Sequence, residues 1–279
     1  MKFKTNIKMV RSGDRLEITR YKDAVIYGQP PNLIVSNLKP REKSYGEKVL
    51  SRYISAKRSK QTFTRLVYAN AYQWKSIKGK FIKPTLLTLT FKENIKEVKK
   101  ANDEFTKFIK RLNYEITGEK ISFLKYITVI EFQKRGAVHY HVLFFNYSYL
   151  PKKKLSEIWR QGFIKVERIK TQDIGMAISY LCKYMIKDLG ADKLCGQKSY
   201  FASRDLEKPV IARNQVRNDF FLSLFKEDLE TTEEFRKKFK SAYCGEFDYS
   251  VHNLYKNKNF KKGILDFEEL FGYTKKLSK

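Results

Sequence analysis

The sequence predicts an α+β domain built on an antiparallel sheet with packed helices. Four runs rich in β-branched and aromatic residues occur between residues 84 and 170, and segments with helical periodicity separate them. The resulting order across residues 84–190 is β-α-β-β-α-β-α, which favours one sheet with helices packed on a face. The hydrophobic fraction of 42% is ample for a packed core.

Each predicted element is justified by its local pattern. The strands are rich in Val, Ile, Thr, Tyr and Phe, and they span residues 84–91, 125–132, 138–146 and 163–170. The helices carry apolar residues at a spacing of three or four, and they cover about residues 95–112, 152–160 and a segment containing residues 178–189.

The flanking segments differ from this central pattern. Residues 1–38 alternate weakly and suggest short strands, and residues 46–74 are typical of a helix. From residue 41 to residue 83 the Lys and Arg residues exceed the acidic ones by ten, so we expect this arm to contact DNA. We therefore divide the chain into a basic, partly helical N-terminal extension (1–83), a core domain (84–210) and a helical or irregular C-terminal extension (211–279).

The charge of the chain indicates its partner. The formal net charge is +28, and a surface this basic favours a polyanion, with nucleic acid as the default. No apolar run approaches the roughly 18 residues of a membrane span, and the N-terminal residues lack the apolar core of a signal peptide. The odd set Cys182, Cys195 and Cys244 has no CxxC spacing. We therefore expect a cytoplasmic protein without a membrane partner.

A histidine pair stands on the third predicted strand. Two of the three histidines in the chain are His139 and His141, and their i, i+2 spacing on a strand directs both imidazoles to one face. This geometry lets one cation bind both rings. A half-buried strand that carries two imidazoles by chance is the alternative.

The preceding hairpin adds a carboxylate to this pair. Lys134, Arg135 and Gly136 suit a three-residue loop that ends in a left-handed glycine. That loop places Glu131 opposite His139, so Glu131, His139 and His141 converge, and Gln133 lies beside them. A two-residue loop would instead place Phe132 opposite His139 and abolish the site.

The three convergent residues form a candidate metal site. Two imidazoles and one carboxylate leave coordination positions open, which favours a catalytic ion over a structural one. Mg²⁺ or Mn²⁺ would fit phosphate chemistry.

The last predicted helix carries two interlocked Tyr-x-x-Lys units. Tyr180 and Tyr184 are one turn apart on one helix face, and Lys183 and Lys187 are likewise one turn apart on an adjacent strip. A nearby cation or a metal-held phosphate would help a tyrosine to act as a nucleophile. An amphipathic helix with half-buried tyrosines is the structural alternative.

Three motifs in this order resemble the HUH replication-initiator superfamily, in particular the replication-associated proteins of single-stranded DNA phages and related bacterial mobile elements. LLTLTF (86–91) resembles the first motif of the family, EFQKRGAVHYHVLFF (131–145) the His-hydrophobic-His motif, and AISYLCKYMIKD (177–188) the tyrosine motif in its two-tyrosine form. YFASRDLEKP (200–209) is similar to a segment that follows the core. The resemblance spans about residues 84–210.

The resemblance implies the HUH endonuclease fold with a five-stranded antiparallel sheet, and a divalent ion held by Glu131, His139 and His141. Tyr180 or Tyr184 would attack single-stranded origin DNA, leaving a 5′-phosphotyrosine and a 3′-OH that primes rolling-circle replication. Lys183 would steady the phosphate for Tyr180, and Lys187 would do so for Tyr184. The implied partners are origin DNA and a helicase of the bacterial host cell, and the oligomeric state stays open.

Two other interpretations remain open at this point. A plasmid-mobilising relaxase or a single-tyrosine transposase would share the fold, although paired tyrosines and the lack of a helicase-like region argue against both. A non-catalytic nucleic-acid-binding module would use the sheet as a stacking platform. Such a module would not need His139, His141 and Tyr180 together.

Overall fold

The computed structural model describes residues 3–27, 44–71, 73–76, 79–147, 149–170, 173–187, 200–241, 244–256, 267 and 270–271. The chain divides into two compact units. The central unit comprises residues 43–207, and the terminal unit combines residues 1–42 with residues 208–279. The terminal unit draws on two distant segments of the sequence because strands from residues 3–27 and from residues 210–253 share one sheet.

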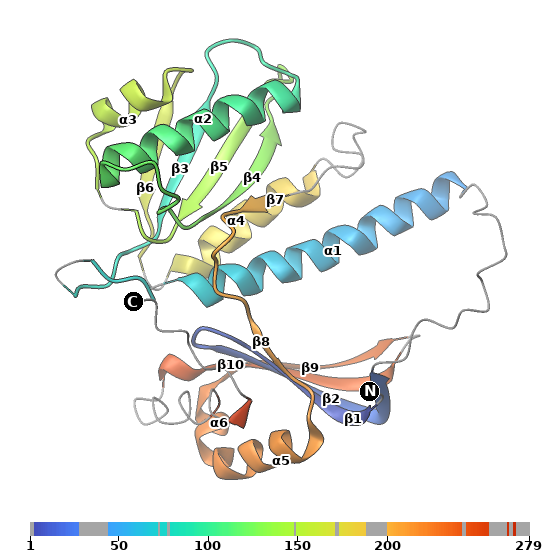
Figure 1. The fold of residues 1–279 in the computed structure, drawn as a ribbon. Coiled ribbons are helices and arrows are strands. Elements are labelled where there is room, and N and C mark those ends of the chain that lie inside the picture. Colours follow the sequence, from blue (N-terminus) through green and yellow to red (C-terminus); the bar gives the residue numbers. More distant parts are fainter. Residues whose placement is uncertain are drawn as a thin grey trace. The chain divides into compact units, whose positions relative to one another are not determined.

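The sheet of the central unit has five antiparallel strands in the order β6-β3-β5-β4-β7 (Figure 1). Its strands are β3 (Thr85–Thr90), β4 (Tyr126–Phe132), β5 (Val138–Phe144), β6 (Ile164–Arg168) and β7 (Tyr200–Ala202). The α+β class and the five-stranded antiparallel sheet are thereby confirmed.

Helices cover both faces of this sheet. They are α1 (Tyr45–Asn70), α2 (Val98–Thr117), α3 (Lys152–Trp159) and α4 (Ile174–Lys187). On one face α2 and α3 bury Phe108 and Trp159 against Leu89 and Tyr140. On the other face α4 and α1 bury Leu181 and Phe63 against Leu86, Leu143 and their neighbours. The order predicted from the sequence is confirmed, but the helices are not confined to one face.

Helix α1 is capped and exposed at its N-terminal end and buried toward its C-terminal end. Ser44 accepts a hydrogen bond from the Glu47 amide, and the Glu47 carboxylate accepts one from the Ser44 amide, which together form a capping box. Towards the C-terminal end, Phe63 and Val67 are fully buried in the core shared with α4. The cations Lys57, Arg58 and Lys60 are exposed, so they are available to a polyanion.

The terminal unit contains a second antiparallel sheet, with the order β8-β1-β2-β10-β9. Its strands are β1 (Phe3–Ser12), β2 (Arg15–Tyr27), β8 (Val210–Ala212), β9 (Glu233–Ser241) and β10 (Gly245–Asn253). The strands expected near the N-terminus are present. The C-terminal segment, expected to be helical or irregular, contributes three strands as well as helices.

One face of this second sheet is covered by α5 (Gln215–Leu224) and α6 (Lys226–Thr232) (Figure 1). Met9 and Ile18 of the sheet pack with Phe221 of α5 and Leu229 of α6. A short 3₁₀ turn, Leu254–Lys256, follows β10. The terminal unit therefore has a core of its own.

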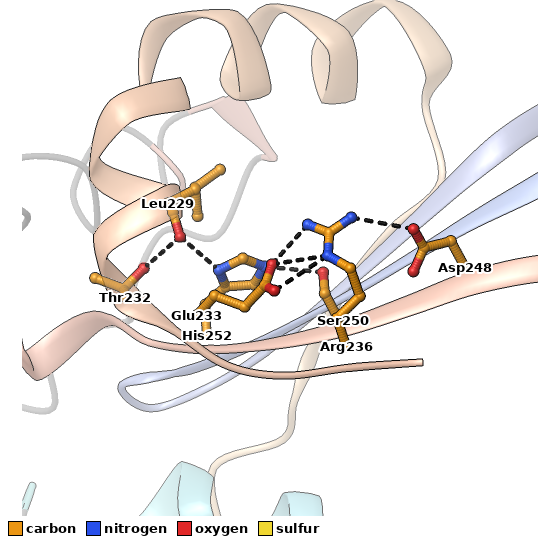
Figure 2. Close-up of polar contacts among 7 residues, drawn as sticks. All are labelled: Leu229, Thr232, Glu233, Arg236, Asp248, Ser250 and His252. Carbon is orange, nitrogen blue, oxygen red and sulfur yellow. Dashed lines mark hydrogen bonds and ion pairs between the residues drawn. The ribbon is translucent and has the colours of Figure 1, made fainter. Parts of the chain in front are cut away.

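A buried polar network joins α6 to the sheet (Figure 2). His252 Nδ1 donates to the Leu229 carbonyl at 2.9 Å, and His252 Nε2 accepts from the Ser250 hydroxyl at 2.9 Å. Beside it, Arg236 pairs with Glu233 at 2.6 Å and with Asp248 at 3.0 Å. The third histidine of the chain thus serves the terminal unit and lies outside the central unit.

Within the described part of the chain, no helix combines the length and the apolar character needed to cross a membrane.

Candidate metal site and adjoining tyrosines

The β4–β5 hairpin has the register that the sequence predicts. The Gln133 amide donates to the Ala137 carbonyl at 2.9 Å, and Gly136 adopts the left-handed φ of 85° that closes the three-residue loop. Glu131 therefore pairs directly with His139. The alternative register with Phe132 opposite His139 is excluded.

The three predicted ligands converge on one face of the sheet. Their ligand atoms all lie within 4.8 Å of one another. Glu131 Oε2 is 3.0 Å from His141 Nε2 and 3.6 Å from His139 Nδ1. His141 is almost fully buried, whereas Glu131 and His139 keep part of their side chains accessible. His141 is therefore enclosed by the protein, whereas solvent can reach Glu131 and His139.

Two threonines of β3 orient the imidazoles. Thr90 Oγ1 lies 2.7 Å from His139 Nε2, and Thr88 Oγ1 lies 3.3 Å from His141 Nδ1. The strand register explains both contacts, because Thr88 pairs with His141 and Thr90 with His139. These hydroxyls bond the ring nitrogens that face away from Glu131, as outer-shell partners of metal-binding histidines do.

The backbone at Thr90 is held in turn by the last residue of α3 and by the segment that follows this helix. Trp159 Nε1 donates to the Thr90 carbonyl at 3.2 Å. Gly162, with a φ of 150°, lies so close to β3 that an added Cβ would be 2.4 Å from the same carbonyl oxygen. Glycine is required there, since any side chain would displace the strand that carries Thr90.

The electrostatics of the site favour a neutral imidazole at His139. Burial, together with the neighbouring His141, lowers the pKa of His139 to about 4. Both effects penalise the protonated ring. A neutral ring keeps a lone pair for coordination at neutral pH.

The donor set fits a divalent cation. Two imidazole nitrogens and a carboxylate oxygen suit a first-row divalent ion with positions left for substrate or water. Ligands at right angles around an ion at about 2.1 Å are about 3 Å apart, which is near the Glu131–His141 separation. The geometry establishes a possible metal site and leaves the identity of the ion open.

Both tyrosines of α4 lie against the same imidazole. The Tyr184 ring stacks on His141 with centroids 4.2 Å apart and an angle of 8°. Tyr180 meets His141 edge-on at 5.4 Å, and the two tyrosine rings are 5.1 Å apart. The helix reaches this position because its apolar residues, including Leu181, pack on β3, β4 and β5.

The two tyrosines differ in their surroundings. The Tyr180 residue has 36% of its surface exposed to solvent, whereas Tyr184 is half-buried and packs against the core. Burial, a hydrogen bond with Tyr180 and the negative charge of Glu131 all raise the pKa of Tyr184. Tyr184 therefore keeps its proton at neutral pH, and Tyr180 is the more accessible hydroxyl.

The remaining sequence candidates are Lys183, Lys187 and Gln133. Lys183 is exposed on α4 and forms no ion pair or cation–π contact with another described residue. The side chain of Lys187 lies outside what the structure describes. The side-chain oxygen of Gln133 accepts a hydrogen bond from Arg135 at 3.2 Å.

Sequence reasoning missed Thr88, Thr90 and Gly162. A signal for the threonines was present, since their i, i+2 spacing matches that of His139 and His141 on the neighbouring strand. Their pairing could not be read from the sequence because β3 and β5 are separated by α2 and β4. Gly162 had no signal, since its role depends on a contact with β3.

The fold and site define an α+β protein with a candidate two-histidine, one-carboxylate metal centre beside two tyrosines. Residues 84–189 match a family model of replication-associated proteins, the ORF2 family. The match covers well under half of the chain, but it begins just before β3, extends beyond α4 and includes the triad and both tyrosines. No curated protein and no solved structure matches the chain. The similarity supports a role in DNA replication.

Proposed function

We propose that this protein initiates rolling-circle replication by nicking and rejoining single-stranded origin DNA through a covalent 5′-phosphotyrosine. The observation that carries the proposal is the packing of Tyr180 and Tyr184 on His141, a member of the candidate metal triad. A tyrosine nucleophile and an electrophilic centre are needed at one place for this chemistry. The similarity to replication-associated proteins supports the same activity.

The reaction is a transesterification at phosphorus. The Tyr180 oxygen bonds to the phosphorus of the scissile phosphodiester, and the bond to the 3′-oxygen breaks. The phenol loses its proton and the departing 3′-oxygen gains one, so the products are a 5′-phosphotyrosine and a free 3′-OH. The ester linkage is conserved, and attack by a 3′-OH can therefore rejoin the strand.

The residues of the chain have distinct proposed roles. Glu131, His139 and His141 would hold Mg²⁺ or Mn²⁺, which would polarise a phosphoryl oxygen. Tyr180, the more exposed tyrosine, makes the first attack, and Tyr184 makes the second after one round of replication. Lys183 and Lys187 would steady the phosphate. A host helicase in the bacterial cytoplasm would unwind the template.

The test is the capture of the covalent adduct. We expect the full-length protein, incubated with Mn²⁺ and end-labelled single-stranded oligonucleotides of randomised sequence, to form a species that survives a denaturing gel. Peptide mass spectrometry should place the DNA on Tyr180. EDTA should abolish the adduct, and sequencing of the captured strands should reveal the preferred origin. DNA binding without any adduct would overturn the proposal in favour of a non-catalytic module.

The paired tyrosines also favour this function over a single-tyrosine transposase. In a one-tyrosine enzyme the second ring has only a packing role, whereas here both rings contact the same imidazole. Formation of single-stranded circles from a template with two origin copies separates these two possibilities.

A further inference from the structure

A continuous row of aromatic rings crosses one face of the terminal-unit sheet. We call this set the aromatic face. It consists of seven side chains from β1, β2, β9 and β10, namely Phe3, Tyr21, Tyr27, Phe235, Phe239, Phe247 and Tyr249. The metal-site chemistry of the central unit does not use any of them.

The rings of β9 and β10 contact one another in sequence. Phe247 stacks on Phe239 with centroids 5.5 Å apart and an angle of 23°. Tyr249 meets Phe239 at 6.3 Å and Phe235 at 6.3 Å, both edge-on. The strand register explains this arrangement, because Phe247 pairs directly with Phe239.

The row continues across β2 to the edge of β1. Tyr21 lies 6.0 Å from Phe247, and its hydroxyl is 3.2 Å from that of Tyr27. Tyr27 in turn stacks on Phe3 with centroids 5.6 Å apart and an angle of 22°. Each ring therefore touches the next one from β9 to β1.

The aromatic face is the side of the sheet opposite the helices. Phe247 pairs with Tyr21, whereas Ser250 pairs with Ile18, which packs with α5 and α6. Alternation along β2 places Tyr21 and Ile18 on opposite faces. Phe3, Phe235 and Phe239 keep 41%, 46% and 38% of their surface exposed, a high value for rings this large.

Cations accompany the rings. The Lys237 ammonium lies 5.6 Å from the centre of the Phe239 ring, and the Arg213 guanidinium lies 4.8 Å from that of Tyr27. Lysines on an edge strand such as β9 also discourage sheet-to-sheet aggregation. That role would explain Lys237, but it does not explain why Lys237 lies between Phe235 and Phe239 on one face of the strand.

We propose that the aromatic face is a second binding surface for single-stranded DNA, on which successive bases stack while Lys237 and Arg213 contact the phosphates. The aromatic rings suit the flat, apolar base of an unpaired nucleotide, and the cations between them suit its anionic phosphate. Duplex DNA keeps its bases stacked internally and cannot offer them. A second copy of this chain is disfavoured because it would oppose like charges in a protein of net charge +28.

This inference rests on the proposed function only in the choice of single-stranded DNA as the ligand. The two sites make different demands. The central unit would bind the strand at the phosphodiester that is cut, and the aromatic face would hold a neighbouring stretch without cleaving it. Loss of one activity therefore need not remove the other.

The test compares the affinity of full-length variants for a fluorescein-labelled oligothymidylate, measured by fluorescence anisotropy in EDTA. We expect Phe235→Ala/Phe239→Ala to weaken binding by about tenfold or more, since each stacked base is lost with its ring. The slope of affinity against salt should stay unchanged, because no charge is removed. The affinity for duplex DNA should also be unaffected.

A matched control is Phe220→Ala/Leu224→Ala on α5, which removes two exposed apolar side chains from the same unit. It should bind oligothymidylate like the wild type. Phe235→Leu/Phe239→Leu keeps the apolar character without the rings, and should lose affinity as the alanine pair does. Thermal unfolding of each variant shows whether the sheet is intact.

Affinities of the folded leucine pair within about twofold of the wild type would overturn the proposal. So would an altered oligomeric state with unchanged DNA affinity, which would make the face a contact between copies. The control Phe220→Ala/Leu224→Ala should form the tyrosine adduct at the wild-type level. If even the wild type forms no adduct but the affinity difference persists, the proposed function fails and the stacking surface stands.

Discussion

Tyr184 stacks almost parallel on His141, with 4.2 Å between ring centroids. Tyr180 meets the same imidazole edge-on from one helical turn away. A tyrosine pair and a candidate metal ligand therefore share one contact surface. Because aromatic pairs are worth about 0.5–1.5 kcal/mol each, this packing also helps to fix α4 on the sheet.

The first prediction concerns the two hydroxyls. Tyr180→Phe should lose most of the initial adduct or shift the adduct to Tyr184, because the exposed nucleophile is gone. Tyr184→Phe should keep initial nicking but impair termination and the release of single-stranded circles. Mass spectrometry of trapped adducts and gel analysis of circle formation check both outcomes.

Tyr149→Phe is the control for the tyrosine variants, since Tyr149 is exposed and belongs to the same unit. It should behave like the wild type in both assays. If Tyr184→Phe forms circles normally and DNA is found only on Tyr180, Tyr184 serves packing alone and the two-tyrosine mechanism is wrong.

The second prediction concerns the imidazoles. His139→Ala and His141→Ala should each reduce nicking at least about a hundredfold, since an electrophilic metal is worth several kcal/mol. Affinity for single-stranded DNA should change little, because Lys and Arg supply it. His252→Gln is the control, and it should nick normally although it destabilises the terminal unit. A double alanine variant that cleaves at the normal rate would refute the metal site.

The third prediction concerns the threonine that orients His139. Thr90→Val removes the hydroxyl that lies 2.7 Å from the imidazole while keeping the β-branched shape. Mn²⁺ affinity, measured by calorimetry, should fall by about 10–100-fold with little loss of stability. Thr85→Val on the same strand is the control, since the Thr85 hydroxyl donates to the Lys83 carbonyl and not to an imidazole. Equal Mn²⁺ affinities for the two variants would deny Thr90 this role.

The fourth prediction concerns the basic arm. Reversing Lys57, Arg58 and Lys60 to Glu should weaken single-stranded DNA binding and lower its salt slope by about 2, at about 0.7 per lost phosphate contact. The triple variant Lys99→Glu/Lys100→Glu/Lys110→Glu on α2 carries the same charge change and is the control. If both variants change the slope equally, the arm contributes only to the overall charge.

The fifth prediction concerns pH and the network in Figure 2. Burial and the positive charges of Arg236 and Arg20 lower the pKa of His252. The hydrogen bond to the Leu229 carbonyl and the negative charge of Glu233 raise the pKa, but the lowering effects are larger. The unfolded chain titrates near about 6.5, so below that pH it binds a proton that the folded unit resists. The free energy of unfolding should therefore fall with acidification.

The slope of that loss approaches about 1.4 kcal/mol per pH unit while one proton separates the two states. Thermal unfolding between about pH 5 and pH 8 measures it. His252→Gln should be less stable near neutral pH and should show a smaller dependence on pH. An identical pH dependence in both proteins would place the acid sensitivity elsewhere.

Local patterns predicted most elements of the central fold. Runs rich in β-branched and aromatic residues identified β3 to β6, and the Lys-Arg-Gly turn indicated the register that brings Glu131 opposite His139. Both patterns involve residues that are close in sequence, so they can be interpreted without knowledge of the rest of the chain. The convergence of the triad is confirmed, whereas metal binding and the roles of the tyrosines stay predictions.

Long-range contacts could not be predicted in the same way. The charged segment Glu233–Ser241 resembles a solvated helix or loop, yet it forms the edge strand β9 because β10 offers a paired neighbour. Similarly, β2 joins β10 across more than two hundred residues of sequence. Such pairing depends on which other strands are available, and no local pattern records it.

The division of the chain into a continuous central unit and a split terminal unit has a consequence for biosynthesis. The ribosome delivers β1 and β2 first, but β8 and β10, their neighbours in the sheet, come only after the whole central unit. At about 5–20 residues per second, the hairpin waits about 10–40 s for β8. The nascent chain can therefore close the core around Glu131, His139 and His141 while the second sheet is still incomplete. The aromatic face is assembled last, when β9 and β10 arrive.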